Sequence, residues 1–318
     1  METGHWVALV GSGVVLLGLI GGGIKWLVHR HDKRNEIEVK LDPRLELAKH
    51  EQRMGDISEE MIDYRGALGH YQKADKHLQA TGPVSEERAW VLVDAGNKHV
   101  ELAEYEAAIG CYKEAWAIFL KEPEKNQAHI AGMLNNIAVV YKDQGNFDEA
   151  LEYYQKALSI FETLGKNRLV TAMTYNNTAV VYENQGKLDE ALDYYKKALP
   201  IFEALGKNHP LTAGIYNNFG EVCRKQGKFD EALKWYQKNL AITEKMPGKN
   251  HPDTAKTYGN IAVVYKEQGK LDEALELCKK ALTVFEEKLG KDHPNTIKCR
   301  RNMDELTEQL QTQTTTTT

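Results

Sequence analysis

Apolar residues recur at helical spacing through most of the chain. From Phe147 to Phe161 they follow the spacing i, i+3, i+4, i+7, i+11 and i+14, which is the buried stripe of an amphipathic helix. The segment from Leu134 to Tyr141 carries a similar stripe, and Gly145 between the two can take the left-handed conformation that ends a helix. The pattern therefore predicts a helical hairpin.

The same hairpin pattern recurs along the chain at a nearly fixed period. Alanines fall at steps of 41 or 42 residues, at Ala67, Ala108, Ala150, Ala191, Ala232 and Ala274. A period of this size is typical of a solenoid, in which each hairpin buries its faces only by stacking on its neighbours. We expect an all-α solenoid over residues 47–310, with repeats at about 47–80, 89–122, 131–164, 172–205, 213–246 and 255–288, a capping helix at 295–310 and a disordered tail at 311–318.

The first thirty residues have a different composition. Thr3 to Ile24 contains no formal charge over 22 residues, which is enough for a helix to cross about 30 Å of hydrocarbon. Positive charges follow at Lys25 and Arg30, so the positive-inside tendency places the rest of the chain in the cytosol. These features predict a transmembrane anchor at residues 1–28, with residues 6–28 in the bilayer, and a polar linker at 29–46.

Gly11, Gly18 and Gly22 share one face of this expected span. They would allow close approach of a helix partner in the membrane. The alternative is that these glycines only lower the hydrophobicity of a simple anchor. An anchor with a basic flank on its C-terminal side resembles the signal anchors of mitochondrial outer-membrane proteins, so that membrane is slightly favoured over the endoplasmic reticulum.

Composition and motifs argue against several functional classes. The net charge of −5 gives little electrostatic attraction to nucleic acid, and four cysteines without a CxxC pair suggest neither zinc nor a disulfide framework. Asp-Glu pairs recur at 148/149, 189/190, 230/231 and 272/273, where a helix dipole favours acids. We therefore expect no catalytic residues, no cofactor, no metal and no nucleic-acid partner.

Four segments carry a common motif. They begin at Asn135, Asn176, Asn217 and Gly259 and read NNIAVVYKDQGNFDEALEYYQKAL, NNTAVVYENQGKLDEALDYYKKAL, NNFGEVCRKQGKFDEALKWYQKNL and GNIAVVYKEQGKLDEALELCKKAL. These segments resemble tetratricopeptide repeats. The period and the connectors LGKNHPLTA and PGKNHPDTA resemble the kinesin light chain subclass. The resemblance implies a right-handed solenoid of antiparallel helix pairs, whose first helices line a concave groove.

The resemblance also implies a peptide-binding surface on the first helices. Asparagine side chains offer both a donor and an acceptor, so a row of them can hold the main chain of an extended peptide. Basic residues one turn further on would add selectivity for acidic groups. The candidate residues are Asn135, Asn136, Asn176, Asn177, Asn217, Asn218, Asn260, Lys142, Arg224, Lys225 and Lys266.

Two alternatives remain for these residues. The asparagines could tie neighbouring helices together by hydrogen bonds, either all of them or one of each pair, and the basic residues could be ordinary solvated surface. The functional hypothesis is a membrane-anchored adaptor that binds a partner protein through an extended segment. The alternative is a structural subunit of a larger membrane complex, docked through the glycine face of the span and the convex surface.

Overall fold

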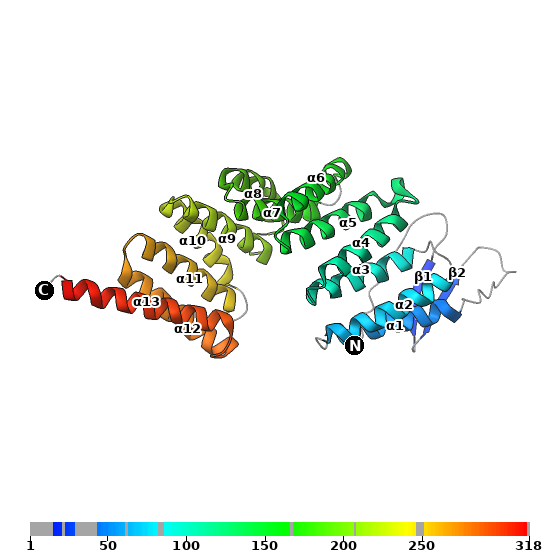
Figure 1. The fold of residues 1–318 in the computed structure, drawn as a ribbon, viewed down its shortest axis with the longest axis horizontal. Coiled ribbons are helices and arrows are strands. Elements are labelled where there is room, and N and C mark those ends of the chain that lie inside the picture. Colours follow the sequence, from blue (N-terminus) through cyan, green and yellow to red (C-terminus); the bar gives the residue numbers. More distant parts are fainter. Residues whose placement is uncertain are drawn as a thin grey trace.

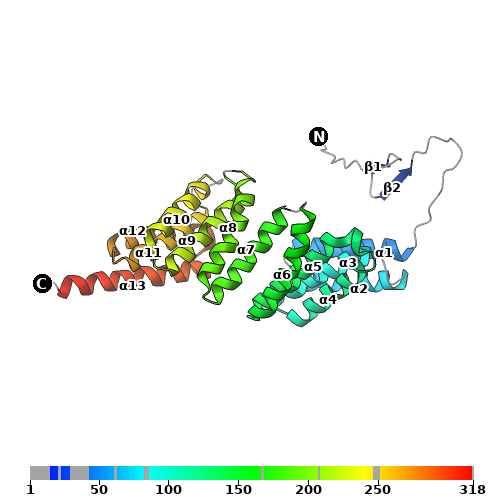
Figure 2. The same cartoon turned by 90° about the horizontal axis from the view of Figure 1, so that it is seen from above.

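The computed structural model describes residues 15–20, 23–28, 43–60, 63–81, 86–165, 168–206, 208–245 and 251–316. Within these ranges thirteen helices follow one another along an elongated array, each packed mainly on the helix before and the helix after it (Figures 1 and 2). This confirms the predicted helical solenoid. The helices are α1 (Pro43–Glu60), α2 (Tyr64–Thr81), α3 (Glu86–Glu101), α4 (Tyr105–Phe119), α5 (Pro123–Asp143), α6 (Phe147–Leu164), α7 (Arg168–Asn184), α8 (Leu188–Glu203), α9 (Pro210–Lys225), α10 (Phe229–Thr243), α11 (Pro252–Glu267), α12 (Leu271–Leu289) and α13 (Pro294–Thr316).

The array is curved, and the first helix of each hairpin lies on the inside of the curve. Figure 1 shows α5, α7 and α9 on the inner side of the bend and α6, α8 and α10 on the outer side. In addition, α5 contacts α7 and α9 contacts α11 directly, across the helix that separates them in sequence. The concave face is therefore built from successive first helices.

A row of buried aromatic rings holds the hairpins together. Five tyrosines of the second helices are at most 2% exposed and recur at steps of 41 or 42 residues, at Tyr71, Tyr112, Tyr154, Tyr195 and Tyr236. Several of these rings lie directly on a glycine of the first helix. A Cβ atom added at Gly96 would lie 2.7 Å from a ring carbon of Tyr112, so a larger residue there would push the helices apart. We call these five residues the tyrosine ladder.

The turns inside the hairpins share one backbone conformation. Four of them place a glycine at positive φ, with values of 80° at Gly145, 75° at Gly186, 73° at Gly227 and 76° at Gly269. At the corresponding position between α3 and α4 stands Ala103, with φ of 56°. A Cβ atom makes this conformation unfavourable, so the α3–α4 turn carries backbone strain that the other four turns avoid.

The N-terminal region differs from the sequence prediction. Val15–Ile20 (β1) and Gly23–Val28 (β2) pair as antiparallel strands, with Gly18 opposite Lys25. Among the helices that the structure describes, none has both the length and the apolar character needed to cross a bilayer. Residues 15–20 and 23–28 are therefore strands where a transmembrane helix at 1–28 was predicted, and the single-pass localisation, in the mitochondrial outer membrane or the endoplasmic reticulum, is wrong. The predicted bilayer contact through residues 6–28 has no described helix to carry it, and the other residues of 1–28 lie outside the described ranges.

The physical reason lies in the glycine content of this run. Gly18, Gly21, Gly22 and Gly23 fall within six residues, and each glycine disfavours a helix by about 1 kcal/mol relative to alanine. Short runs of valine and leucine fit a strand equally well, so hydrophobicity alone did not separate the two states. The predicted helix–helix contact through Gly11, Gly18 and Gly22 has no helix to carry it at Gly18. Gly11, Gly22 and most of the predicted linker lie outside the described residues.

Replacing Ala103 with glycine should stabilise the protein by about 0.5–1 kcal/mol, because it removes the Cβ strain at positive φ. The matched control is Gly145→Ala, which introduces the same strain in the α5–α6 turn and should destabilise the protein by a similar amount. Urea unfolding followed by circular dichroism measures both changes. A loss of stability in Ala103→Gly would contradict this account of the turn.

The hydroxyl groups of the tyrosine ladder predict a second difference between repeats. The Tyr195 hydroxyl donates a hydrogen bond to Glu183 Oε2 at 3.0 Å, whereas the buried Tyr154 hydroxyl has no hydrogen-bond partner among the described residues. Tyr195→Phe should therefore cost about 1 kcal/mol of stability, whereas Tyr154→Phe should be neutral or slightly stabilising. Thermal unfolding of both variants checks this, and equal losses would contradict it.

Candidate functional site

A groove of about 460 Å³ runs along the concave face across α7, α9 and α11. Most of the lining comes from the first helices of three successive repeats. Polar side chains cover much of it, and Met173 and Leu211 add exposed apolar surface. The lining includes Met173, Asn176, Asn177, Leu211, Asn217, Asn218, Lys256 and Asn260.

The starts of the helices at this groove are fixed by His-Pro connectors. The Nδ1 atom of His209 accepts a hydrogen bond from the backbone N–H of Leu211 at 3.2 Å, and His251 does the same for Asp253. The following prolines occupy the first helical turn, where a missing N–H group costs nothing. These two histidines therefore act as helix caps.

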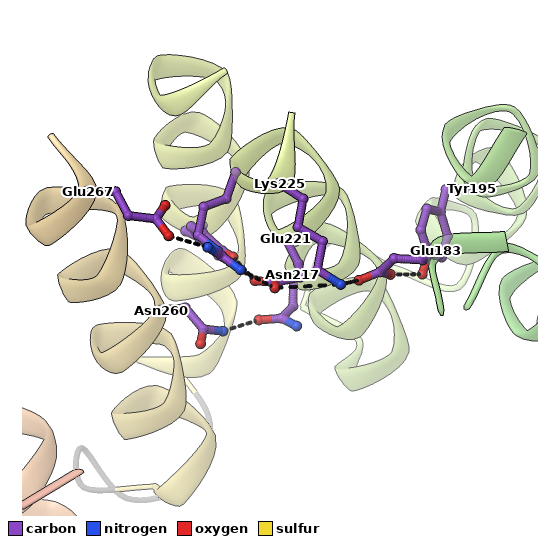
Figure 3. A network of polar contacts seen from close by, with 9 residues as sticks. Glu183, Tyr195, Asn217, Glu221, Lys225, Asn260 and Glu267 are labelled. Carbon is purple, nitrogen blue, oxygen red and sulfur yellow. Dashed lines mark hydrogen bonds and ion pairs between the residues drawn. The ribbon is translucent and has the colours of Figure 1, made fainter. Parts of the chain in front are cut away.

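Most of the candidate asparagines bind one another across neighbouring helices. Asn218 Nδ2 donates to Asn176 Oδ1 at 2.9 Å, and Asn260 Nδ2 donates to Asn217 Oδ1 at 2.7 Å, as drawn for the second pair in Figure 3. Asn135 accepts a hydrogen bond from the Thr174 hydroxyl at 3.1 Å. For these residues the structure shows the alternative anticipated from the sequence, in which asparagines tie adjacent first helices together.

Asn177 behaves differently. Its side chain lines the groove and makes no hydrogen bond to any other residue in the part of the chain that the structure describes. Asn136 likewise has no hydrogen bond within those residues, but it does not line the groove. Among the candidate asparagines that line the groove, Asn177 is thus the one whose whole amide is available to a ligand.

The candidate basic residues are all engaged in ion pairs. Lys225 Nζ lies 2.7 Å from Glu183 Oε1, and the Arg224 guanidinium lies 2.6 Å from Glu221 Oε1. The network around Glu183, Glu221, Lys225 and Glu267 appears in Figure 3. Lys266 pairs with Glu305 at 2.9 Å and Lys142 with Asp143 at 3.0 Å. An acidic ligand would therefore have to exchange with an existing partner at each position.

The pKa values around Glu221 are consistent with this pairing. Burial alone would raise the pKa of the Glu221 carboxyl group, but the hydrogen bonds and charge of Arg224 outweigh burial and lower it. The bond to Glu221 in turn raises the pKa of Arg224. Both groups are fully charged at neutral pH, and the pair contributes little net charge to the concave face.

One functional candidate was missed from the sequence. Asp94 on α3 stands at the repeat position that Asn136 holds on α5 and Asn177 holds on α7, the next two first helices. It accepts a hydrogen bond from Gln52 Nε2 at 3.2 Å. Burial raises the pKa of Asp94 to about 6; the bond from Gln52 and the charge of Lys98 oppose this shift, and Asp56 and Glu59 add to it. The available signal was a carboxylate at a position that is asparagine in each of the four following repeats.

Stacked helical hairpins with a polar concave groove define this chain as a helical repeat protein of a kind suited to protein–protein interaction. The sequence profile of the tetratricopeptide repeat family matches residues 129–204, 211–287 and 253–303. The chain belongs to the tetratricopeptide repeat family.

The relatives agree with this assignment. Protein KINESIN LIGHT CHAIN-RELATED 1 of Arabidopsis thaliana is 28% identical over 135 residues, which are 42% of this chain and 21% of that protein. The chain thus spans about a fifth of the length of this relative. The sequence resemblance to kinesin light chain-like repeats is confirmed.

Solved structures show the same fold. BtubC (BKLC) from P. vanneervenii superposes with a TM-score of 0.60 at 21% identity, covering 80% of this chain and 95% of that one. Aspartyl phosphate phosphatase F from Bacillus subtilis gives a TM-score of 0.62 at 15% identity, covering 83% and 71%. At these identities the likeness concerns the fold alone.

The raised pKa of Asp94 predicts a pH-dependent stability. Its folded pKa of about 6 lies above the ordinary value of 3.8, so folding takes up a proton between these values and stability falls as pH rises through that window. Asp94→Asn keeps an acceptor for Gln52 and removes the buried charge. Its stability advantage should be small at pH 4, grow up to about pH 7 and then level off. Urea unfolding across this range measures it, and equal pH slopes in both proteins would contradict the prediction.

Proposed function

We propose that this protein is a scaffold that binds an extended segment of a partner protein in the concave groove across α7, α9 and α11. The observation that carries the proposal is the Asn177 amide, which lines the groove and lacks a partner among the described residues. An amide can donate to a main-chain carbonyl and accept from a main-chain N–H group. Asn177 is thus suited to hold a peptide backbone without requiring one particular side chain.

The charges of the groove support a ligand recognised mainly by its main chain. Arg224 and Lys225 are paired with Glu221, Glu267 and Glu183, so the concave face presents little unbalanced charge. The apolar contribution comes from Met173, which is 44% exposed, and from Leu211, which is 37% exposed. A bound segment would cover both side chains and gain free energy from the removal of apolar surface from water.

Asn177→Ala should weaken peptide binding about tenfold while leaving the unfolding midpoint unchanged, because the side chain contributes to the ligand and not to the fold. The probe is a set of peptides selected on the wild-type protein from a random dodecapeptide library, with dissociation constants measured by calorimetry.

Asn218→Ala is the matched control. This substitution breaks the bond to Asn176 and should lower stability by about 1 kcal/mol. If the selected peptides bind Asn177→Ala and wild type equally, or if the library yields no binding peptide, the proposal fails.

A further inference from the structure

The tyrosine ladder ends one repeat before the last helical hairpin. The step of 41 or 42 residues that leads from Tyr195 to Tyr236 leads next to Cys278 on α12. In the fourth repeat the Tyr195 ring lies between two first helices, since its hydroxyl donates to Glu183 on α7 and its ring centroid lies 5.7 Å from that of Phe219 on α9. A cysteine cannot span the corresponding space between α11 and α13.

That space is a pocket that is open to solvent, and we call it the cavity below. About 390 Å³ is open between α11, α12 and α13, with the buried Cys278 side chain among the residues that line it. Ala262 and Val263 of α11 and Leu306 of α13 supply apolar lining. The polar lining comes from Lys266, Glu267, Asn302 and Gln309. Its size falls within the range of about 300–1,000 Å³ that is usual for ligand sites.

The helix facing Cys278 leaves room for a ring. In the third and fourth repeats Ala138 and Ala179 belong to the same packed clusters as Tyr154 and Tyr195, so an alanine on the first helix is compatible with a buried tyrosine. Ala262 takes this place in the sixth repeat and clusters with Cys278. The sixth repeat therefore keeps the alanine that accompanies a ladder tyrosine and lacks the ring.

We propose that an aromatic side chain of the bound partner segment occupies this cavity, in the place that a tyrosine of the chain itself fills in the preceding five repeats. The inference rests on the proposed function, because the ring belongs to the same segment that lies in the concave groove. Asn260 of that groove and Val263 of the cavity lie three residues apart on α11, less than one helical turn and on nearly the same face of the helix. One extended segment can therefore reach both.

The chemistry of the lining matches an aromatic ring. Apolar carbon from Ala262, Val263 and Leu306 would cover its faces. The Lys266 ammonium group, held 2.9 Å from Glu305, stands at the cavity and can interact with the ring through a cation–π contact. The Asn302 amide can accept from or donate to a phenolic hydroxyl group.

The central test is Cys278→Tyr, which supplies the missing ring from within the chain. It should raise the thermal unfolding midpoint, because it fills an existing cavity, and it should abolish binding of p-cresol, the side-chain analogue of tyrosine. Wild type should bind p-cresol with a dissociation constant in the millimolar range, measured by shifts of the α11 and α13 amide signals in NMR spectra. Cys278→Ala is the control, since it removes the thiol, leaves the cavity open and should keep p-cresol binding.

Peptides from the dodecapeptide library connect the cavity to the partner segment. Those selected on wild type should share one aromatic residue. Cys278→Tyr should weaken them at least tenfold, and so should replacement of that aromatic residue by alanine. The two changes together should weaken peptide binding little more than either change alone, because both remove the same contact between the aromatic ring and the cavity.

The outcomes separate this inference from the proposed function. Peptides that depend on Asn177 but carry no aromatic residue would overturn the inference and leave the groove proposal standing. A lowered unfolding midpoint in Cys278→Tyr with unchanged peptide affinity would also overturn it. If no peptide binds the chain, both proposals fall.

Discussion

The structure depends on one contact, the insertion of a tyrosine ring from the second helix of each of the first five hairpins between two successive first helices. An aromatic side chain buries about 150–250 Å² of surface, and here the same ring meets both the first helix of its own hairpin and that of the next. Tyr195 shows both contacts, through Glu183 on α7 and Phe219 on α9. Folding of a hairpin and stacking on its neighbour are therefore a single event, as expected for an array whose stability comes from adjacent repeats.

Polar bonds between repeats then fix how each hairpin is rotated against the next. Gln185 and Gln226 donate to Asp148 and Asp189, the first-turn acids of the preceding second helices. The Tyr216 hydroxyl donates to Glu203 in a similar way. Because these bonds recur with the period, the rotation is similar at each step and the first helices come to lie side by side. The concave groove is a consequence of this regular rotation.

The sequence alone was sufficient for the features that depend on local spacing. The helical hairpins, their period and the glycine turns at Gly145 and Gly186 all follow from residue order. Side-chain partners did not follow, because they depend on the offset between neighbouring helices. Asn218 meets Asn176, the first asparagine of the preceding pair, and not its equivalent Asn177. The period gives no information on that offset, so the sequence could not separate tied asparagines from available ones.

The N-terminal prediction failed for a different reason. An uncharged apolar run satisfies the length criterion for a membrane helix, yet the same run contains closely spaced glycines around Gly18 and Gly23, which disfavour a helix. Hydrophobicity favours a membrane helix in this run, whereas the helix propensity of its glycines opposes one, and the prediction rested on hydrophobicity alone. Within the repeats the two agree, since alanine, leucine, glutamate and lysine dominate there, and the prediction was correct.

Repeats also act as internal controls, because each one shows what its neighbours would contain if packing were the only requirement. Ala103 departs from the glycine of other turns, and Tyr154 lacks the hydroxyl acceptor that Tyr195 has. Both departures affect stability, but neither leaves a pocket between the described helices. Cys278 removes a whole ring and leaves a cavity. Loss of a ring in the middle of the array would weaken stacking on both sides, whereas in the sixth repeat only α13 follows among the described helices. Among the described hairpins, the sixth is therefore the one in which a binding cavity disrupts the fewest described contacts between repeats.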